Sequence, residues 1–139
     1  MELKKEDNWE IRMVILVTGK SGSGKSFYAR HLAYEMESAG KAVKLIDGDV
    51  WRQQTHNRDF TDDGRLENLL SAAKQAQSYE EQGFTVVMAF ICPKKIWRVQ
   101  MRSMWLSSRL VYIPGGTLWE GTEYEMPDEK EFYHVLNMR

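Results

Sequence analysis

The stretch from Gly19 to Ser26 reads Gly-Lys-Ser-Gly-Ser-Gly-Lys-Ser and has the spacing G-x-x-x-x-G-K-S. The apolar, largely β-branched run of residues 13–18 precedes it and predicts a buried strand. Helix-forming residues follow from Phe27 to Ser38, and Gly40 is a stop signal. Such a loop turns successive backbone N–H groups inward, and the N-terminus of the helix adds partial positive charge. The motif therefore predicts a phosphate-binding loop.

This loop predicts a nucleoside triphosphate site. Lys25 would reach the β- and γ-phosphates, and the Ser26 hydroxyl would hold Mg²⁺. The phosphate-binding residues would be Gly19, Lys20, Ser21, Gly22, Ser23, Gly24, Lys25 and Ser26. The alternative is that these residues form a turn that only connects the strand to the helix and binds no ligand. The strand before the loop and the helix after it disfavour this alternative. A switch GTPase is disfavoured because the chain has no N-K-x-D guanine motif.

Composition restricts the kinds of partner. Nineteen basic and twenty acidic residues leave a net charge of −1, so no whole-chain field favours nucleic acid or an anionic membrane. Cys92 is the only cysteine, which excludes an intrachain disulfide and suits a reducing cytoplasm. The charged stretch from Met1 to Arg12 lacks the apolar segment of a signal peptide, and no apolar run approaches the roughly 20 residues of a membrane helix.

Strand and helix patterns alternate along the chain. Further strands are predicted at residues 42–47, 84–91 and 109–113, with a short last strand at 131–136. Helices are predicted from about Asp62 to Gln82, capped by Thr61, and from Pro93 to about Ser107. The segment from Trp51 to Asp63 is predicted to be irregular. The alternation predicts one domain over residues 1–139 with an α/β, three-layer P-loop NTPase fold and a mainly parallel sheet of about five strands.

Several polar residues outside the loop are candidates for a site. Asp49 follows the second strand, at the edge of a parallel sheet where ligands lie, so it is a candidate base or magnesium partner; a solvated turn is the alternative. Arg65 and Asn68, three apart on one helix, would bind an anion or face solvent. Arg98 and Arg102, four apart, would clamp a phosphate or face water. Trp119 is a candidate cover for a base.

Together these residues resemble the adenylylsulfate kinase (APS kinase) family, P-loop kinases that phosphorylate the 3′-hydroxyl of adenosine 5′-phosphosulfate with Mg-ATP. The family's D-G-D-N-V-R is matched by residues 47–52, and its F-S-E-E-D-R-I-E-N by residues 60–68. Its A-F-I-S-P, followed by two arginines four apart, is matched by residues 89–93, Arg98 and Arg102. These motifs run in order from about Val14 to Arg102.

The resemblance implies roles for individual residues. Asp49 would contact the acceptor hydroxyl, and Phe60 would stack on the acceptor's adenine. The phosphosulfate would be held by Arg52, Arg65 and Asn68, and the adenine pocket would be completed by Ile91 and Pro93. Cys92 stands where some members carry a serine that is phosphorylated as an intermediate.

The chain departs from the family after its fourth strand. The family's R-D-x-K-G-L-Y lid helix, which covers ATP and supplies charge to the transition state, is absent. Residues 113–117 instead lead almost directly to residues 121–127, which weakly resemble the family's F-T-G-I-D-D-P-Y-E-P-P.

The sequence thus predicts a cytoplasmic, ATP- and Mg²⁺-dependent kinase of sulfate assimilation, with Lys25 and Asp49 as catalytic residues and adenylylsulfate as the small-molecule acceptor. It predicts no membrane partner and leaves a homodimer open. One alternative is a kinase acting on a hydroxymethylated pyrimidine nucleotide or DNA, although the net charge argues against DNA. The other is a nucleotide-binding module that lost catalysis with its lid, against which the presence of both Lys25 and Asp49 argues.

Overall fold

The computed structural model describes residues 12–118 and 123–136, and its centre is a parallel sheet of five strands. The strand order is β2-β3-β1-β4-β5, and every pairing is parallel. The strands are β1 (Val14–Thr18), β2 (Val43–Asp47), β3 (Thr85–Phe90), β4 (Ser108–Tyr112) and β5 (Tyr133–Val135). This sheet confirms the predicted fold class. The N-terminal stretch used to judge targeting and the candidate Trp119 lie outside the described residues.

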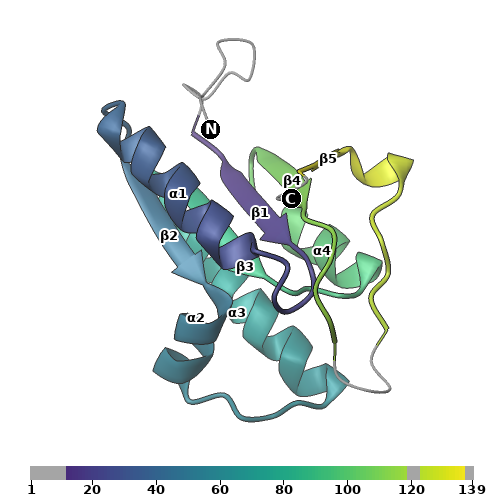
Figure 1. The fold of residues 1–139 in the computed structure, drawn as a ribbon. Helices are drawn as coiled ribbons and strands as arrows, with labels where there is room; N and C mark the ends of the chain where they lie inside the picture. The colour runs from purple at the N-terminus through teal and green to yellow at the C-terminus, as the bar shows by residue number, and fades with distance from the viewer. Residues whose placement is uncertain (1–11, 119–122, 137–139) are drawn as a thin grey trace.

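Helices cover both faces of the sheet, as Figure 1 shows. They are α1 (Lys25–Ser38), α2 (Gly48–Thr55), α3 (Asp62–Glu81) and α4 (Lys95–Arg102), followed by the short 3-10 helix η2 (Glu129–Glu131). α1 packs on one face, while α3 and α4 pack on the other. In the part of the chain that the structure describes, no helix is long and apolar enough to cross a membrane.

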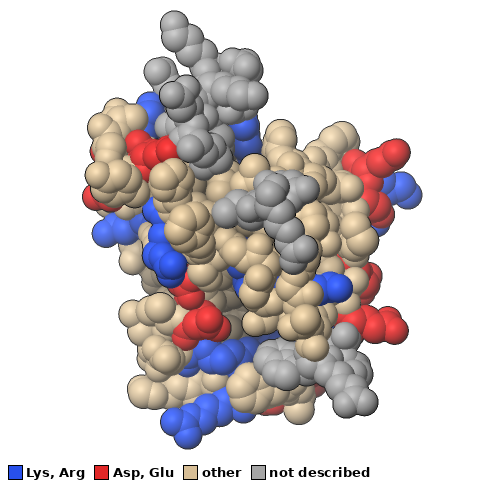
Figure 2. Space-filling model, in the orientation of Figure 1, with Lys and Arg blue, Asp and Glu red and all other residues tan. Residues whose placement is uncertain are grey.

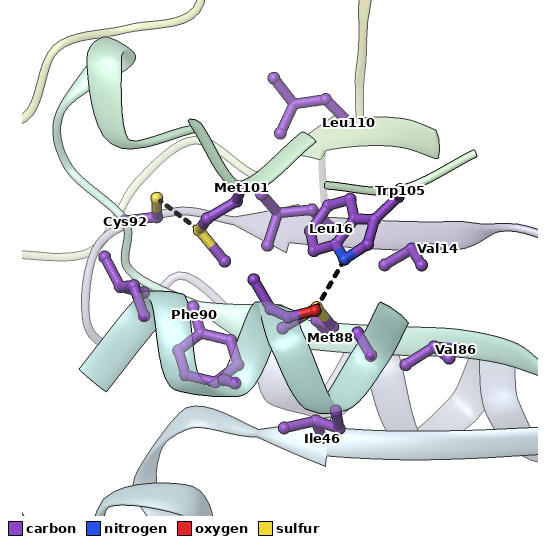
Figure 3. Packing of buried hydrophobic residues seen from close by; sticks show 14 of the residues in the cluster. Val14, Leu16, Ile46, Val86, Met88, Phe90, Cys92, Met101, Trp105 and Leu110 are labelled. Carbon is purple, nitrogen blue, oxygen red and sulfur yellow. Dashed lines mark hydrogen bonds between the residues drawn. The ribbon is translucent and has the colours of Figure 1, made fainter. Parts of the chain in front are cut away.

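The two faces of the sheet use alternate residues of the same strands, because successive side chains of a strand point in opposite directions. Val14 and Leu16 of β1 face α3 and α4, whereas Ile15 and Val17 face α1. Figure 3 shows the first of these two cores, with Trp105 inserted between the sheet and α3. Burial on both faces explains why β1 and β3 are almost continuously apolar.

Three predicted boundaries differ from the structure. Residues 51–55 of the segment predicted to be irregular belong to helix α2, which the Asp47 side chain caps by accepting a hydrogen bond from the Asp49 N–H. α4 ends at Arg102 rather than near Ser107, and beyond it the Trp105 indole donates to the Ala73 carbonyl of α3. β5 is shorter than the predicted strand. The predicted Thr61 cap of α3 is confirmed by its bond from the Gly64 N–H.

Candidate functional site

The glycine-rich loop connects β1 to α1 and leaves its polar groups available to an anion. Gly22 and Gly24 have φ angles of 78° and 101°, a left-handed conformation that glycine adopts without strain. Gly24 caps α1 and has no side chain to occupy the first N–H groups of the helix. The Ser23 hydroxyl is buried without a hydrogen-bond partner in the described residues. A phosphate group would supply partners for these donors.

Lys25 begins α1 at the edge of the same loop. Its Nζ donates a hydrogen bond of 3.4 Å to the Lys20 carbonyl. Burial lowers the pKa of Lys25 from its ordinary value, and the nearby carboxylates of Asp49 and Asp47 partly oppose that shift. The ammonium group is thus incompletely compensated, as expected of a group that binds an anion.

The connection after β4 folds back onto the glycine-rich loop, a contact that the sequence did not reveal. The Thr117 N–H donates to the Ser21 carbonyl at 2.8 Å, forming an isolated antiparallel bridge. Gly116, with a φ of 77°, lies so close to the loop that a Cβ would stand 2.4 Å from the Ser21 carbonyl oxygen. Among the described residues between β4 and η2 no helix forms.

This contact predicts that Gly116→Ala weakens ATP binding about tenfold, because the new methyl group must push the Ser21 backbone out of place. Gly40→Ala is the matched control: Gly40 also has a positive φ, of 89°, but no atom lies within 4 Å of the position that a Cβ would take there. Both variants should lose stability from backbone strain, and only Gly116→Ala should change the Kd for ATP measured by calorimetry. Equal affinities in the two variants would contradict the prediction.

A cavity of about 770 Å³ extends from this loop along the carboxyl edge of the sheet. Its wall near the glycine-rich loop includes Ser21, Lys25 and Ser26, together with Thr117 and Leu118. The same cavity is lined by all seven predicted acceptor residues: Asp49, Arg52, Phe60, Arg65, Asn68, Ile91 and Pro93. The structure therefore joins the predicted phosphate end and the predicted acceptor end in one cavity.

The loop between α2 and α3 is organised by Arg52. One Nη atom of Arg52 donates to the carbonyl and the side-chain oxygen of Asn57, at 3.2 and 3.1 Å. Asn57 in turn donates to the Gly64 carbonyl of α3. The Arg52 guanidinium lies 4.7 Å from the centre of the Phe60 ring. Arg52 thus fixes the position of Phe60 besides lining the cavity.

Asn68 and Arg65 lie side by side on α3, but in different environments. Asn68 is only 4% exposed, and its side-chain oxygen has no hydrogen-bond partner in the described residues. Asn68 is therefore buried, and the alternative that it faces solvent is wrong. Arg65 lies 5.9 Å from the ring of Trp97, a cavity residue that no sequence motif singles out.

Arg98 and Arg102 are not brought to the cavity. Arg98 is fully buried and donates to Glu131 and to the Cys92 and Glu125 carbonyls. Arg102 donates to the Ser108 hydroxyl and the Glu131 carbonyl. The predicted phosphate clamp is not formed, because both guanidinium groups are used inside the protein. The partners of the two arginines on the C-terminal segment, Glu125 and Glu131, could not be identified from the spacing of the arginines in the sequence.

The oxygen donors beside Lys25 suit a magnesium ion that arrives with a nucleotide. Ser26, Asp47 and Asp49 all line the cavity. No group of three or more His, Cys, Asp or Glu side chains in residues 12–118 and 123–136 is arranged to hold a metal. Few protein ligands, completed by phosphate oxygens and water, are the usual pattern for Mg²⁺. The residues therefore fit the predicted ion.

Charge on the surface is mixed rather than separated. Figure 2 shows basic and acidic side chains interspersed over the face that it draws. Within the cavity, Lys25, Arg52, Arg58 and Arg65 outnumber the acidic residues Asp47 and Asp49. The positive potential for an anionic ligand is thus local, as the net charge of −1 required.

Comparison with known proteins agrees with this geometry. A family model described as adenylylsulphate kinase matches residues 12–134. An adenylyl-sulfate kinase of Paraburkholderia xenovorans is 42% identical over 82 residues, which are 58% of this chain and 46% of that protein. The chain spans about half the length of the curated relatives it matches.

Solved structures share the fold. The Mycobacterium tuberculosis APS kinase CysC in complex with AMPPNP and APS has a TM-score of 0.78 and 20% identity, covering 89% of this chain and 88% of that one. A hexameric APS kinase from Thiobacillus denitrificans has a TM-score of 0.71 and 25% identity, covering 88% of this chain and 25% of that one. Because the family model matches nearly the whole chain, this protein belongs to the adenylylsulphate kinase family.

Proposed function

We propose that this chain is an ATP-dependent kinase that transfers a γ-phosphate to the 3′-hydroxyl of adenylylsulfate. The observation that carries the proposal is that one cavity is lined both by Lys25 and Ser26 and by the candidate acceptor residues. Phosphoryl transfer depends mainly on positioning and on stabilising charge, and a shared cavity would provide both. The complex of the M. tuberculosis relative with AMPPNP and APS supports this pair of substrates.

In this proposal the glycine-rich loop binds the phosphates of ATP through its backbone N–H groups, and Lys25 neutralises the β- and γ-phosphates. Mg²⁺, held by Ser26 and the nearby carboxylates, would offset charge on the same oxygens. Asp49 orients the acceptor hydroxyl and accepts its proton as the oxygen attacks phosphorus.

The acceptor end is proposed to recognise adenylylsulfate by stacking and by charge. Phe60 would stack on the adenine with one face, while Arg52 lies against the ring at 4.7 Å. Arg65 and the side-chain NH₂ of Asn68 would donate to the phosphosulfate, and the Asn68 side-chain oxygen, which has no partner among the described residues, would accept from a ligand hydroxyl. Ile91 and Pro93 complete the wall.

We further propose a cytoplasmic location, which the single buried Cys92 suits, and association into a homodimer. The hexameric Thiobacillus denitrificans structure supports an oligomer, and light scattering of the purified chain would test it. No nucleic-acid partner is proposed, because the net charge is −1.

The test is ADP release from Mg-ATP with and without adenylylsulfate, together with the mass of the product. We expect ADP only when adenylylsulfate is present, and a product heavier by one phosphoryl group. ATP binding without transfer would overturn the choice of acceptor. Transfer to a hydroxymethylated pyrimidine nucleotide instead would identify a different kinase, and no transfer to any acceptor would indicate a binding module.

A further inference from the structure

The C-terminal segment, residues 123–136, attaches directly to one wall of the cavity, formed by residues 91–93. The Glu125 N–H donates to the Pro93 carbonyl at 2.7 Å. The Thr18 hydroxyl donates to the Ile91 carbonyl at 2.5 Å, so the Tyr124 hydroxyl, 2.7 Å from the same Thr18 oxygen, is the donor in that second bond. Two of the wall's three carbonyl groups are thus linked to this segment.

Arg98 holds the third carbonyl and joins it to the same segment. Its guanidinium donates to the Cys92 carbonyl at 2.9 Å and to the Glu125 carbonyl at 2.7 Å. It also makes a two-pronged ion pair with Glu131, at 2.8 and 3.2 Å. Both side chains are almost completely buried. The planar fork of arginine suits this arrangement, which lysine cannot reproduce.

Cys92 needs such support because its backbone is strained. It has a φ of 42°, in the left-handed region that non-glycine residues avoid. The following proline, Pro93, would favour an extended conformation at this position instead. The left-handed conformation costs on the order of 1–3 kcal/mol and persists only where neighbouring groups enforce it. Figure 3 shows the Cys92 side chain directed at Met101, and the two sulfur atoms are 3.5 Å apart. The bond from Arg98 therefore restrains a strained residue within the wall.

We propose that Arg98 and Glu131 are positioning residues that hold the wall of residues 91–93 in its strained form, so that the C-terminal segment controls acceptor binding without touching the acceptor. This proposal depends on the proposed function in one respect only, the identity of the ligand that binds at this wall. The attachment of the wall can be measured with no substrate present.

The first measurement uses Cys92, the only cysteine in the chain, as a probe of the wall. In the wild type a small thiol reagent such as DTNB should react slowly, because the thiol is buried and burial raises its pKa to about 12. Glu131→Gln removes one charge of the buried pair and should accelerate labelling about tenfold or more by local opening. Lys95→Gln is the matched control, because it breaks the half-buried Lys95–Asp128 pair between the same two segments.

A second variant keeps the test decisive if Glu131→Gln fails to fold. Arg98→Met combined with Glu131→Leu removes both buried charges together, a change that proteins often tolerate. It also deletes the bond to the Cys92 carbonyl, so labelling should again be fast while the melting temperature stays near that of the wild type. A folded double variant with the labelling rate of the wild type would overturn the proposal.

The kinetic readout separates positioning from general loss of structure. In both variants we expect the KM for adenylylsulfate to rise about tenfold, with the KM for ATP and kcat nearly unchanged. Equal increases in both KM values would indicate a purely structural role and overturn the proposal. If the wild type does not phosphorylate adenylylsulfate, the proposed function fails, and the labelling rates still decide whether Arg98 and Glu131 hold the wall.

Discussion

Asp49→Asn is expected to lower phosphate transfer about 100- to 10,000-fold, the usual contribution of a positioned general base. The amide has nearly the shape of the carboxylate but cannot accept the acceptor's proton. Because Asp49 lines the cavity but supplies no cation to the phosphates, the affinity for ATP should change by no more than about twofold. Single-turnover transfer and calorimetry with ATP measure the two quantities separately.

Asp63→Asn is the control for this prediction. Asp63 is an exposed carboxylate in the first turn of α3 and does not line the cavity, so its removal tests the effect of one lost negative charge. Its transfer rate should match that of the wild type. A fully active Asp49→Asn variant would mean that the acceptor hydroxyl needs no base from this residue.

Lys25→Met is expected to lower transfer about 100- to 1,000-fold, because the charge that develops on the phosphates loses the stabilising charge of the Lys25 ammonium group. Unlike Asp49→Asn, it should also weaken ATP binding, since the ammonium group already meets the phosphates in the bound ground state. Lys25→Arg retains the charge and should bind ATP better than Lys25→Met. Equal transfer by wild type and Lys25→Met would remove Lys25 from the proposed mechanism.

The pH dependence of ATP binding tests the same residue. Burial lowers the Lys25 pKa below its ordinary value of 10.5, so the free protein loses this charge at a lower pH than an exposed lysine does. Bound phosphates favour the charged form and raise the pKa again. ATP binding therefore takes up a proton at alkaline pH, and affinity should fall as the pH rises through the lowered pKa. Lys25→Arg should not show this fall below pH 10.5, because arginine stays protonated.

Much of the fold was predictable because its signals are local. A buried strand in a parallel sheet is apolar along its whole length, so β1 and β3 could be located from sequence alone. The glycines and the lysine of the phosphate loop also act through their own backbone and neighbours in the chain. The family resemblance then gave roles to Arg52, Phe60, Arg65 and Asn68, and the structure places all four in the lining of one cavity.

What the sequence determined by itself is therefore the order along the chain of the strands and of helices α1, α3 and α4, the phosphate loop, and the edge of the sheet at which a ligand would bind. Tertiary structure decided the environment of each polar side chain. Arg98 has the spacing of a surface arginine but is buried, because the fold brings it together with Glu131. That partner lies 33 residues away in the sequence. Gly116 carries no motif, yet it contacts the phosphate loop. Such contacts depend on which segments the fold brings together, and no local pattern in a single sequence records that.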